Sequence, residues 1–215
     1  MRAMRSMTYP IWATAFLLYL LFLGWHENWH GALTAEEIDG FSRHINASTI
    51  LTKEQQQTLI DFMESDTGDE FFMLNLVAFY SGEIAQPGSG EMMPAPVLLD
   101  KYFRPFMGKI LRRGGYPAFT AGAVGGYIEA WASADNPGWS GAGLIRYRSR
   151  RDLLLSITDS DFSDAHVFKK AALQATLAMP TQTITGALIS PRLWVGFLIL
   201  ALAALAQIMV LVRKG

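Results

Sequence analysis

The chain has 215 residues, of which 51% are hydrophobic and 17% are charged, and its mean hydropathy is +0.20. This composition excludes an intrinsically disordered chain and differs from that of an ordinary soluble enzyme. The sequence contains no Cys, which excludes disulfides, thiolate catalysis and Cys-ligated metal centres. Residues 26–190 hold all 19 acidic side chains against 13 basic ones, so a nucleic-acid-binding domain driven by bulk positive charge is also excluded.

A charge-free run lies near each end of the chain. Residues 7–25 form a run of 19 residues, and residues 193–212 form a run of 20. At about 1.5 Å per residue, a helix of either length crosses a hydrocarbon core of about 30 Å. The alternative for the first run is a cleaved signal peptide, but no small-x-small site follows it. We therefore predict a transmembrane anchor over 1–25 and a transmembrane helix over 191–215.

The short basic tails predict the orientation of these two helices. Arg2 and Arg5 precede the first run, and Arg213 and Lys214 follow the second. The positive-inside rule then places both termini in the cytoplasm. We expect a two-pass protein of the cell inner membrane, in contact with membrane lipid. Residues 26–190 would be periplasmic or extracellular.

The first part of the intervening chain, residues 26–69, is expected to be a helical linker segment. The patterns from Thr34 to Glu37 and from Thr52 to Gln55 have the spacing of capping boxes, which predicts two short helices. The rest, residues 70–190, is expected to form one folded domain.

The domain opens with residues 70–79, which are nearly all apolar and predict a central strand. Residues 81–94 are rich in Gly, Pro and Ser and predict a loop. Apolar side chains at three-to-four spacing predict an amphipathic helix over 96–113. The remaining expected elements are one or two Gly-punctuated strands over 116–131, a strand over 141–148, a short helix over 149–157, a helix over 161–177 and a last strand over 181–189.

This order of elements predicts an α+β, ferredoxin-like domain in which helices cover one face of an antiparallel sheet. The second face of such a sheet is apolar and must also be covered. Pairing with a second copy, sheet on sheet, is the usual solution.

Several segments also suggest a family, in their order along the chain. Met73-Leu74-Asn75-Leu76 on the first strand resembles the opening strand of the dimeric α+β barrel proteins, in particular an uncharacterised branch akin to the EthD-like and stress-responsive barrels. The later matching features are Tyr102, Arg113-Gly114-Gly115, Trp139, Arg146-Tyr147-Arg148-Ser149-Arg150, Thr158-Asp159-Ser160-Asp161-Phe162, His166 and Ala171-Ala172-Leu173. The resemblance covers roughly residues 50–180.

This resemblance implies a ferredoxin-like fold of the dimeric barrel type. Two features depart from the family pattern. His166 is followed by Val-Phe-Lys-Lys, whereas family members more often have Arg directly after this His, and the membrane spans are additions to a fold that is usually a soluble dimer. The superfamily includes cofactor-free monooxygenases, isomerases, haem-binding enzymes and proteins without known activity, so the fold does not choose a function.

His26, Glu27 and His30 match the H-E-x-x-H pattern. On a helix this spacing puts two imidazoles on one face toward a zinc ion, with the Glu as general base. The pattern lies at the exit of a membrane helix and Gly31 follows at once, so a belt of interfacial Trp and His side chains is the alternative.

Three side chains are candidates for a cavity between sheet and helices. His166 lies at the edge of an apolar helix face and is either a haem ligand or an acid–base group, or a hydrogen-bonded structural histidine. Asn75 is polar on an apolar strand and points into a cavity or bonds to neighbouring backbone. Tyr102 would join them as a cavity group in an enzyme.

Four arginines cluster near the start of the short helix: Arg146, Arg148, Arg150 and Arg151. They are suited to hold an anionic ligand, a lipid headgroup or an acidic partner. The alternative is an exposed strand end with solvated charges.

The sequence contains no convergent catalytic set and implies no cofactor, so we expect a non-catalytic accessory or scaffolding subunit of a membrane complex. Its partner would be another subunit or a second copy. The alternatives are a cofactor-independent monooxygenase- or isomerase-like enzyme acting on a small apolar or quinone-like substrate, and a zinc-binding protein.

Overall fold

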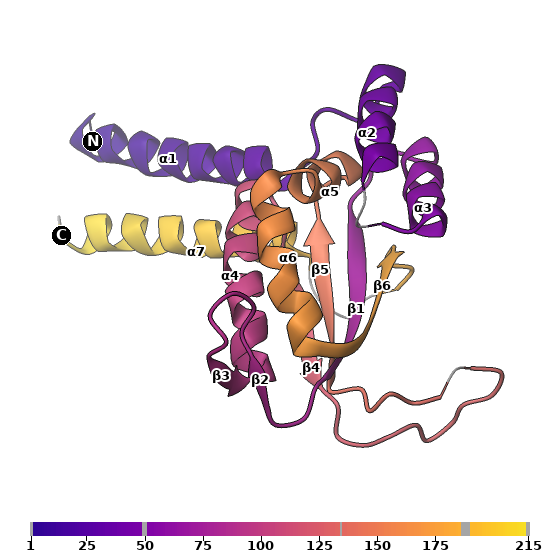
Figure 1. Cartoon of the computed structure of the whole chain (residues 1–215). Helices are drawn as coiled ribbons and strands as arrows, with labels where there is room; N and C mark the ends of the chain where they lie inside the picture. The colour runs from indigo at the N-terminus through magenta and orange to yellow at the C-terminus, as the bar shows by residue number, and fades with distance from the viewer. Residues whose placement is uncertain (1, 49–50, 134, 186–189, 214–215) are drawn as a thin grey trace. The chain divides into compact units, whose positions relative to one another are not determined.

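Figure 1 shows a computed structural model, which describes residues 2–48, 51–133, 135–185 and 190–213. The chain divides into two compact units. The larger unit spans residues 30–183 and contains a four-stranded sheet with its helices. The smaller unit consists of the helices α1 (Arg2–His26) and α7 (Pro191–Val212).

The sheet of the larger unit is antiparallel throughout and has the strand order β4-β5-β1-β6. The central strand β1 (Phe71–Phe79) lies between β5 (Gly141–Tyr147) and β6 (Leu173–Thr181), and β4 (Tyr116–Gly122) pairs with the other side of β5. The expected α+β class and the expected central strand are confirmed.

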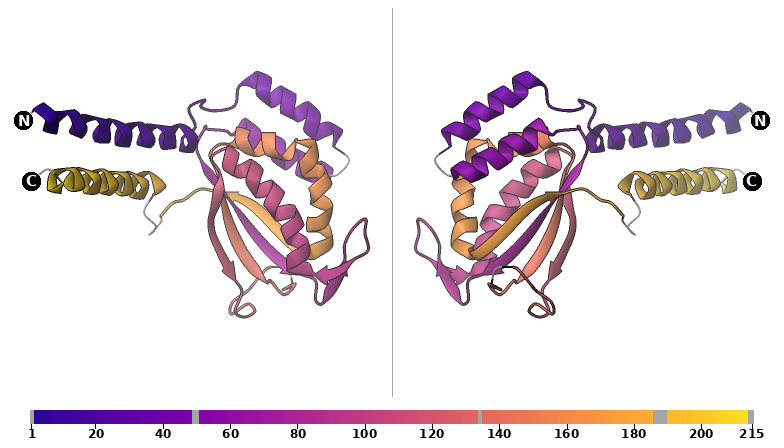
Figure 2. Two further views of the ribbon diagram at one scale, coloured as in Figure 1. Left: turned by 90° about the vertical axis from the view of Figure 1, so that its left-hand side faces the viewer. Right: turned by 90° about the vertical axis from the view of Figure 1, so that its right-hand side faces the viewer.

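Helices α4 (Ala95–Arg112) and α6 (Ser160–Ala172) lie side by side over one face of this sheet (Figures 1 and 2). On α4 the buried side chains Leu98, Tyr102, Phe106 and Ile110 recur every fourth residue, and this spacing gives the helix one apolar face. That face packs against Phe71 of β1 and Tyr147 of β5, whose rings stack at 5.1 Å.

Two further helices, α2 (Ala35–Ala47) and α3 (Lys53–Glu64), belong to the same unit as the sheet. Both begin with the expected capping boxes, in which Thr34 pairs with Glu37 and Thr52 pairs with Gln55. Ile45 of α2 and Met63 of α3 form a second core with Leu154, which lies on α5 (Arg150–Ile157).

The structure corrects the expected helix over 161–177. Helix α6 ends at Ala172, and the next residue begins β6, which pairs with β1 along its length. Helix propensity is a weak preference, and the ladder of hydrogen bonds to β1 outweighs it here. The expected last strand over 181–189 is therefore placed too late, and its residues 186–189 lie outside the described part of the chain.

Two other expectations differ in detail. The expected loop over 81–94 contains a two-stranded ribbon of β2 (Glu83–Ala85) and β3 (Met92–Pro94). The Gly-punctuated segment 116–131 is a strand only as far as Gly122, and a long connection then leads to β5.

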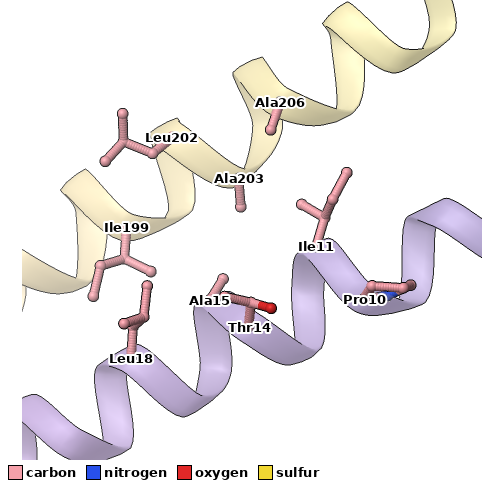
Figure 3. Close-up of a pocket in the computed structure, with 9 residues that line it drawn as sticks. All are labelled: Pro10, Ile11, Thr14, Ala15, Leu18, Ile199, Leu202, Ala203 and Ala206. Carbon is pink, nitrogen blue, oxygen red and sulfur yellow. The ribbon is translucent and has the colours of Figure 1, made fainter.

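The terminal helices α1 and α7 pack on each other, running in opposite directions. Small side chains let their backbones approach, and Ala15 and Ala203 are buried between them (Figure 3). A Cβ atom added to Gly196 would lie 3.4 Å from the ring of Tyr19. By length and composition alone, the segments Thr8–His26 and Pro191–Val212 are long and apolar enough to cross a membrane.

Polar contacts close one end of this helix pair. The Tyr19 hydroxyl donates to the carbonyl oxygen of Arg192 at 3.0 Å. The guanidinium of Arg192 donates two hydrogen bonds to the carboxylate of Glu27, at 2.5 and 2.9 Å. These bonds lower the pKa of Glu27 from its ordinary value.

Candidate ligand cavity

A cavity of about 460 Å³ lies between the sheet and the helices α4 and α6. Most of its wall is aliphatic or aromatic and comes from both layers. The apolar lining residues include Met73, Val77 and Phe79 on β1, and Leu99, Phe103 and Phe106 on α4. Cavities that bind small molecules in proteins typically have such walls.

Glycines on two neighbouring strands create the space for this cavity. In the pairing of the strands, Asn75 lies opposite Gly143, and Val77 lies opposite Gly141. Gly141 in turn lies opposite Gly122 of β4. Because paired residues share a face of the sheet, this end of the covered face lacks the side chains that would fill it.

Asn75 both lines the cavity and bonds to its own strand. Its Nδ2 donates to the carbonyl oxygen of Met73 at 3.0 Å. Both alternatives for this residue are therefore correct, because it is a cavity group and also a backbone-bonded amide.

Two tyrosines are among the lining residues. Tyr102 comes from α4 and Tyr147 from the end of β5, and both are buried. Burial raises the pKa of both phenols above the ordinary value, and Tyr102 adds to the shift of Tyr147. Both phenols therefore stay protonated at neutral pH.

Helix α6 contributes Lys169, whose Nζ lies 5.6 Å from the centre of the Tyr102 ring. Lys169 and Tyr147 were not among the site residues expected from the sequence. The signal for Lys169 was its spacing, because it follows Ala165 by four residues and precedes Ala172 by three on the apolar side of its helix.

His166 does not line the cavity and instead packs behind Tyr102. The two rings meet edge to face at 6.0 Å, and His166 is half-buried. Burial, together with the neighbouring charges of Lys169 and Lys170, lowers the pKa of His166. Of the three expected cavity groups, Asn75 and Tyr102 thus share the cavity, and His166 supports one of its walls.

The four clustered arginines hold parts of this chain together. Arg146 is 1% exposed and donates to Glu70 at 2.6 Å and to the carbonyl oxygen of Gly114 at 2.7 Å. Arg148 donates two bonds of 2.9 Å to Asp152. The interpretation as solvated charges at an exposed strand end is therefore wrong, because carboxylates of this chain neutralise these guanidinium groups.

The other two arginines link α5 to the segments before the sheet. Arg150 donates to Ser65 at 2.8 Å, and its guanidinium lies 4.3 Å from the centre of the Phe62 ring. Arg151 donates to Glu37 at 2.6 and 2.9 Å. An anionic ligand would have to displace these partners, and binding of such a ligand here stays a prediction.

The H-E-x-x-H residues are divided between the two units. Helix α1 ends at His26, so the helical geometry of the motif does not continue to His30, which belongs to the larger unit. Nδ1 of His26 lies 3.0 Å from Oε1 of Glu27. Within the described part of the chain, no group of three or more His, Asp or Glu side chains is placed to hold a metal ion.

No family model and no curated protein matches the chain. Its fold is similar to that of RPA0582, a protein of unknown function from Rhodopseudomonas palustris. A crystal structure of that protein superposes with a TM-score of 0.50 and 19% identity, over 63% of this chain and 96% of the other. A structure of methylated RPA0582 gives a TM-score of 0.52 and 19% identity, over 64% and 96%. The likeness shows a shared α+β fold.

Proposed function

We propose that the chain is a membrane-anchored, non-catalytic accessory subunit whose larger unit binds one small, largely apolar molecule. The cavity over the sheet carries this proposal. Its wall is mostly apolar with a few convergent polar groups, as in ligand sites of other proteins. The described lining residues include no carboxylate and no imidazole, the side chains that most often carry acid–base chemistry, and this supports binding.

The two terminal helices would hold this unit at the cell inner membrane. Their length and apolar surface support spanning, and their opposite directions agree with two termini on one side. The basic residues of the tails support a cytoplasmic side for the termini, with residues 26–190 periplasmic or extracellular.

The strand order supports a ferredoxin-like fold of the dimeric α+β barrel type. In that arrangement the face of the sheet away from α4 and α6 meets a partner, and we propose a second copy of this chain. That outer face is apolar, and Leu177, Met179 and Phe119 are each at least half exposed on it. Uncovered apolar patches of this kind mark interaction surfaces.

An enzyme is the second candidate, because Asn75 and Tyr102 face one cavity from different layers. A cofactor-independent monooxygenase- or isomerase-like enzyme would place a small apolar or quinone-like substrate between them. Loss of turnover in Asn75→Ala and Tyr102→Phe, with binding retained, would favour this candidate. Zinc binding through His26, Glu27 and His30 has no such geometric support and stays a prediction.

Filling the cavity tests the proposed function. A Cβ atom added to Gly143 would have its nearest neighbours at 3.8 and 3.9 Å, so a larger side chain fits the backbone and projects into the space beside Asn75. We expect Gly143→Leu to weaken binding of the uncharged dye Nile red by about tenfold or more, which corresponds to about 1.4 kcal/mol. The full chain is measured in nanodiscs, with empty nanodiscs subtracted.

Gly108→Leu is the matched control, because an added Cβ at Gly108 on α4 meets nothing within 4 Å. This variant should bind the dye like the wild type. If the wild type shows no saturable binding, or if Gly143→Leu binds as well as Gly108→Leu, the proposed cavity function is rejected.

A further inference from the structure

Lys169 is the single charged side chain among the described residues that line the cavity. It projects from α6, near the end of that helix, and contacts the face of the Tyr102 ring. The next residue, Lys170, is exposed and does not line the cavity. One cation is thus set among apolar walls.

Asn75 and Ser140 of the lining have hydrogen-bond partners within the chain, whereas no carboxylate among the described side chains pairs with the ammonium group of Lys169. Asn75 donates to the carbonyl oxygen of Met73, and Oγ of Ser140 accepts from the backbone N–H of Phe79 at 3.1 Å. Among the described side chains, Lys169 makes no ion pair. Its contact with the Tyr102 ring is a cation–π interaction, which leaves the three N–H donors available.

The surroundings of Lys169 disfavour its charged form. Burial lowers the pKa of this amine. The titratable groups that face it are Tyr102, which stays neutral, and His166. A buried charge is costly unless it is paired, so an anion brought by the ligand would offset this cost.

We propose that the ligand is an amphiphilic monoanion, a long-chain carboxylate whose hydrocarbon chain lies among the apolar walls and whose carboxylate meets Lys169. This inference rests on the proposed function and adds the chemical class of the ligand.

The donors of the lining favour a carboxylate over a phosphate. Phosphate groups are bound by Arg forks or by backbone N–H groups at helix N-termini, often with more than one cation. The lining contains no Arg among its described residues, and the arginines near α5 are already bonded to acids of this chain.

The test compares an acid with its ester. The full chain, in nanodiscs of neutral phosphatidylcholine, is titrated with cis-parinaric acid, an intrinsically fluorescent long-chain carboxylic acid, and with the methyl ester of the same acid. We expect the wild type to prefer the acid by about tenfold, the effect of one hydrogen-bonded charge. Lys169→Met should lose this preference, Lys169→Arg should retain most of it, and Lys170→Met should match the wild type.

The outcomes separate this inference from the proposed function. If the wild type binds both probes saturably and with equal affinity, the proposal of a carboxylate ligand is overturned. The proposed ligand-binding function of the apolar cavity then stands. Absence of saturable binding of either probe overturns both proposals. If Lys169→Met fails to fold, the comparison of acid with ester on the wild type still decides the question. If the preference for the acid is lost in Lys170→Met and kept in Lys169→Arg, the assignment to Lys169 is also overturned.

Discussion

Arg146 joins three separate parts of the larger unit. It lies on β5, its guanidinium bonds to Glu70 at the start of β1, and it also bonds to the carbonyl oxygen of Gly114 after α4. Removing one partner of a buried ion pair costs about 3–5 kcal/mol, because the other charge is left without compensation. We expect Arg146→Met to lower the free energy of unfolding by about 3 kcal/mol, near the low end, because the Glu70 side chain is 30% exposed.

Urea unfolding followed by circular dichroism measures this effect. Arg43→Met is the control, because the pair of Arg43 with Asp39 is exposed on both sides. An exposed pair one helical turn apart contributes about 0.3–0.5 kcal/mol. Equal losses in the two variants would contradict the structural role of Arg146.

Glu37 gives the larger unit a dependence on pH. Hydrogen bonds from Arg151 hold the pKa of Glu37 at about 2, below the ordinary 4.5, and bonds from Thr34 act in the same direction. A depressed pKa in the folded state contributes stability that is complete above the unfolded value and is lost as pH falls from about 4.5 to about 2. We therefore expect Glu37→Gln to be less stable than the wild type at neutral pH.

The difference between Glu37→Gln and the wild type should shrink as the solution is acidified through this range. Thermal melts at a series of pH values measure it. Glu36→Gln, one residue earlier and exposed, should keep the pH dependence of the wild type. A constant difference at all pH values would show that the effect does not come from titration of Glu37.

Single residues of the candidate site were predictable only where one element decided their environment. Asn75 stands out because it is polar on an apolar strand, and Tyr102 because it recurs on the apolar side of a helix. The acidic partners of Arg146 and Arg151 were not predictable, since Glu70 and Glu37 lie more than 70 residues away from them in the sequence, whereas Asp152 lies only four residues after Arg148. Only the packing of α2, α3 and β1 around α5 and β5 brings those acids to them.

Among the elements, the helices with caps and the apolar central strand were predictable from local patterns. The border between α6 and β6 was not, because Leu173 to Leu177 continues an acceptable helical sequence. What decides its structure is the open edge of β1, which needs a partner along its whole length. This pairing depends on the whole sheet, so the periodicity of a single segment does not predict it.

The pairing of α1 with α7 can be tested with cysteines, because the chain contains none of its own. Ala15 and Ala203 are buried between the two helices and face each other (Figure 3). We expect the double variant Ala15→Cys/Ala203→Cys to form an intramolecular disulfide under mild oxidation, because disulfides require close and facing Cβ atoms.

Mass spectrometry of the alkylated protein detects this disulfide as a loss of two free thiols. Leu17 and Leu205 are each 57% exposed on their helices, and Leu17→Cys/Leu205→Cys is the control that should remain reduced. Oxidation of both pairs to the same extent would argue against a defined packing of the two helices.

At the scale of the whole molecule, the proposed orientation in the membrane follows from charges outside the spans. A reporter that is active only in the cytoplasm, fused after Gly215, should be active, and the same reporter inserted in the exposed β4–β5 connection should be inactive. An inactive C-terminal fusion together with an active insertion in the β4–β5 connection would reverse the assignment.

The last prediction concerns the outer face of the sheet and its proposed second copy. Leu177 of β6 is 58% exposed on this face, and it pairs in register with Leu76 of β1. A charge placed there would be desolvated in a sheet-on-sheet contact, and burying an unpaired charge is strongly unfavourable. We expect the wild type, in mild detergent, to have the mass of two chains by light scattering, and Leu177→Lys to have the mass of one.

Val97→Lys is the control, at a position 51% exposed on α4, and it should keep the mass of two chains. A wild type that is a single chain would contradict the second copy, and a stable assembly with a different protein across this face would replace it with a heteromeric complex.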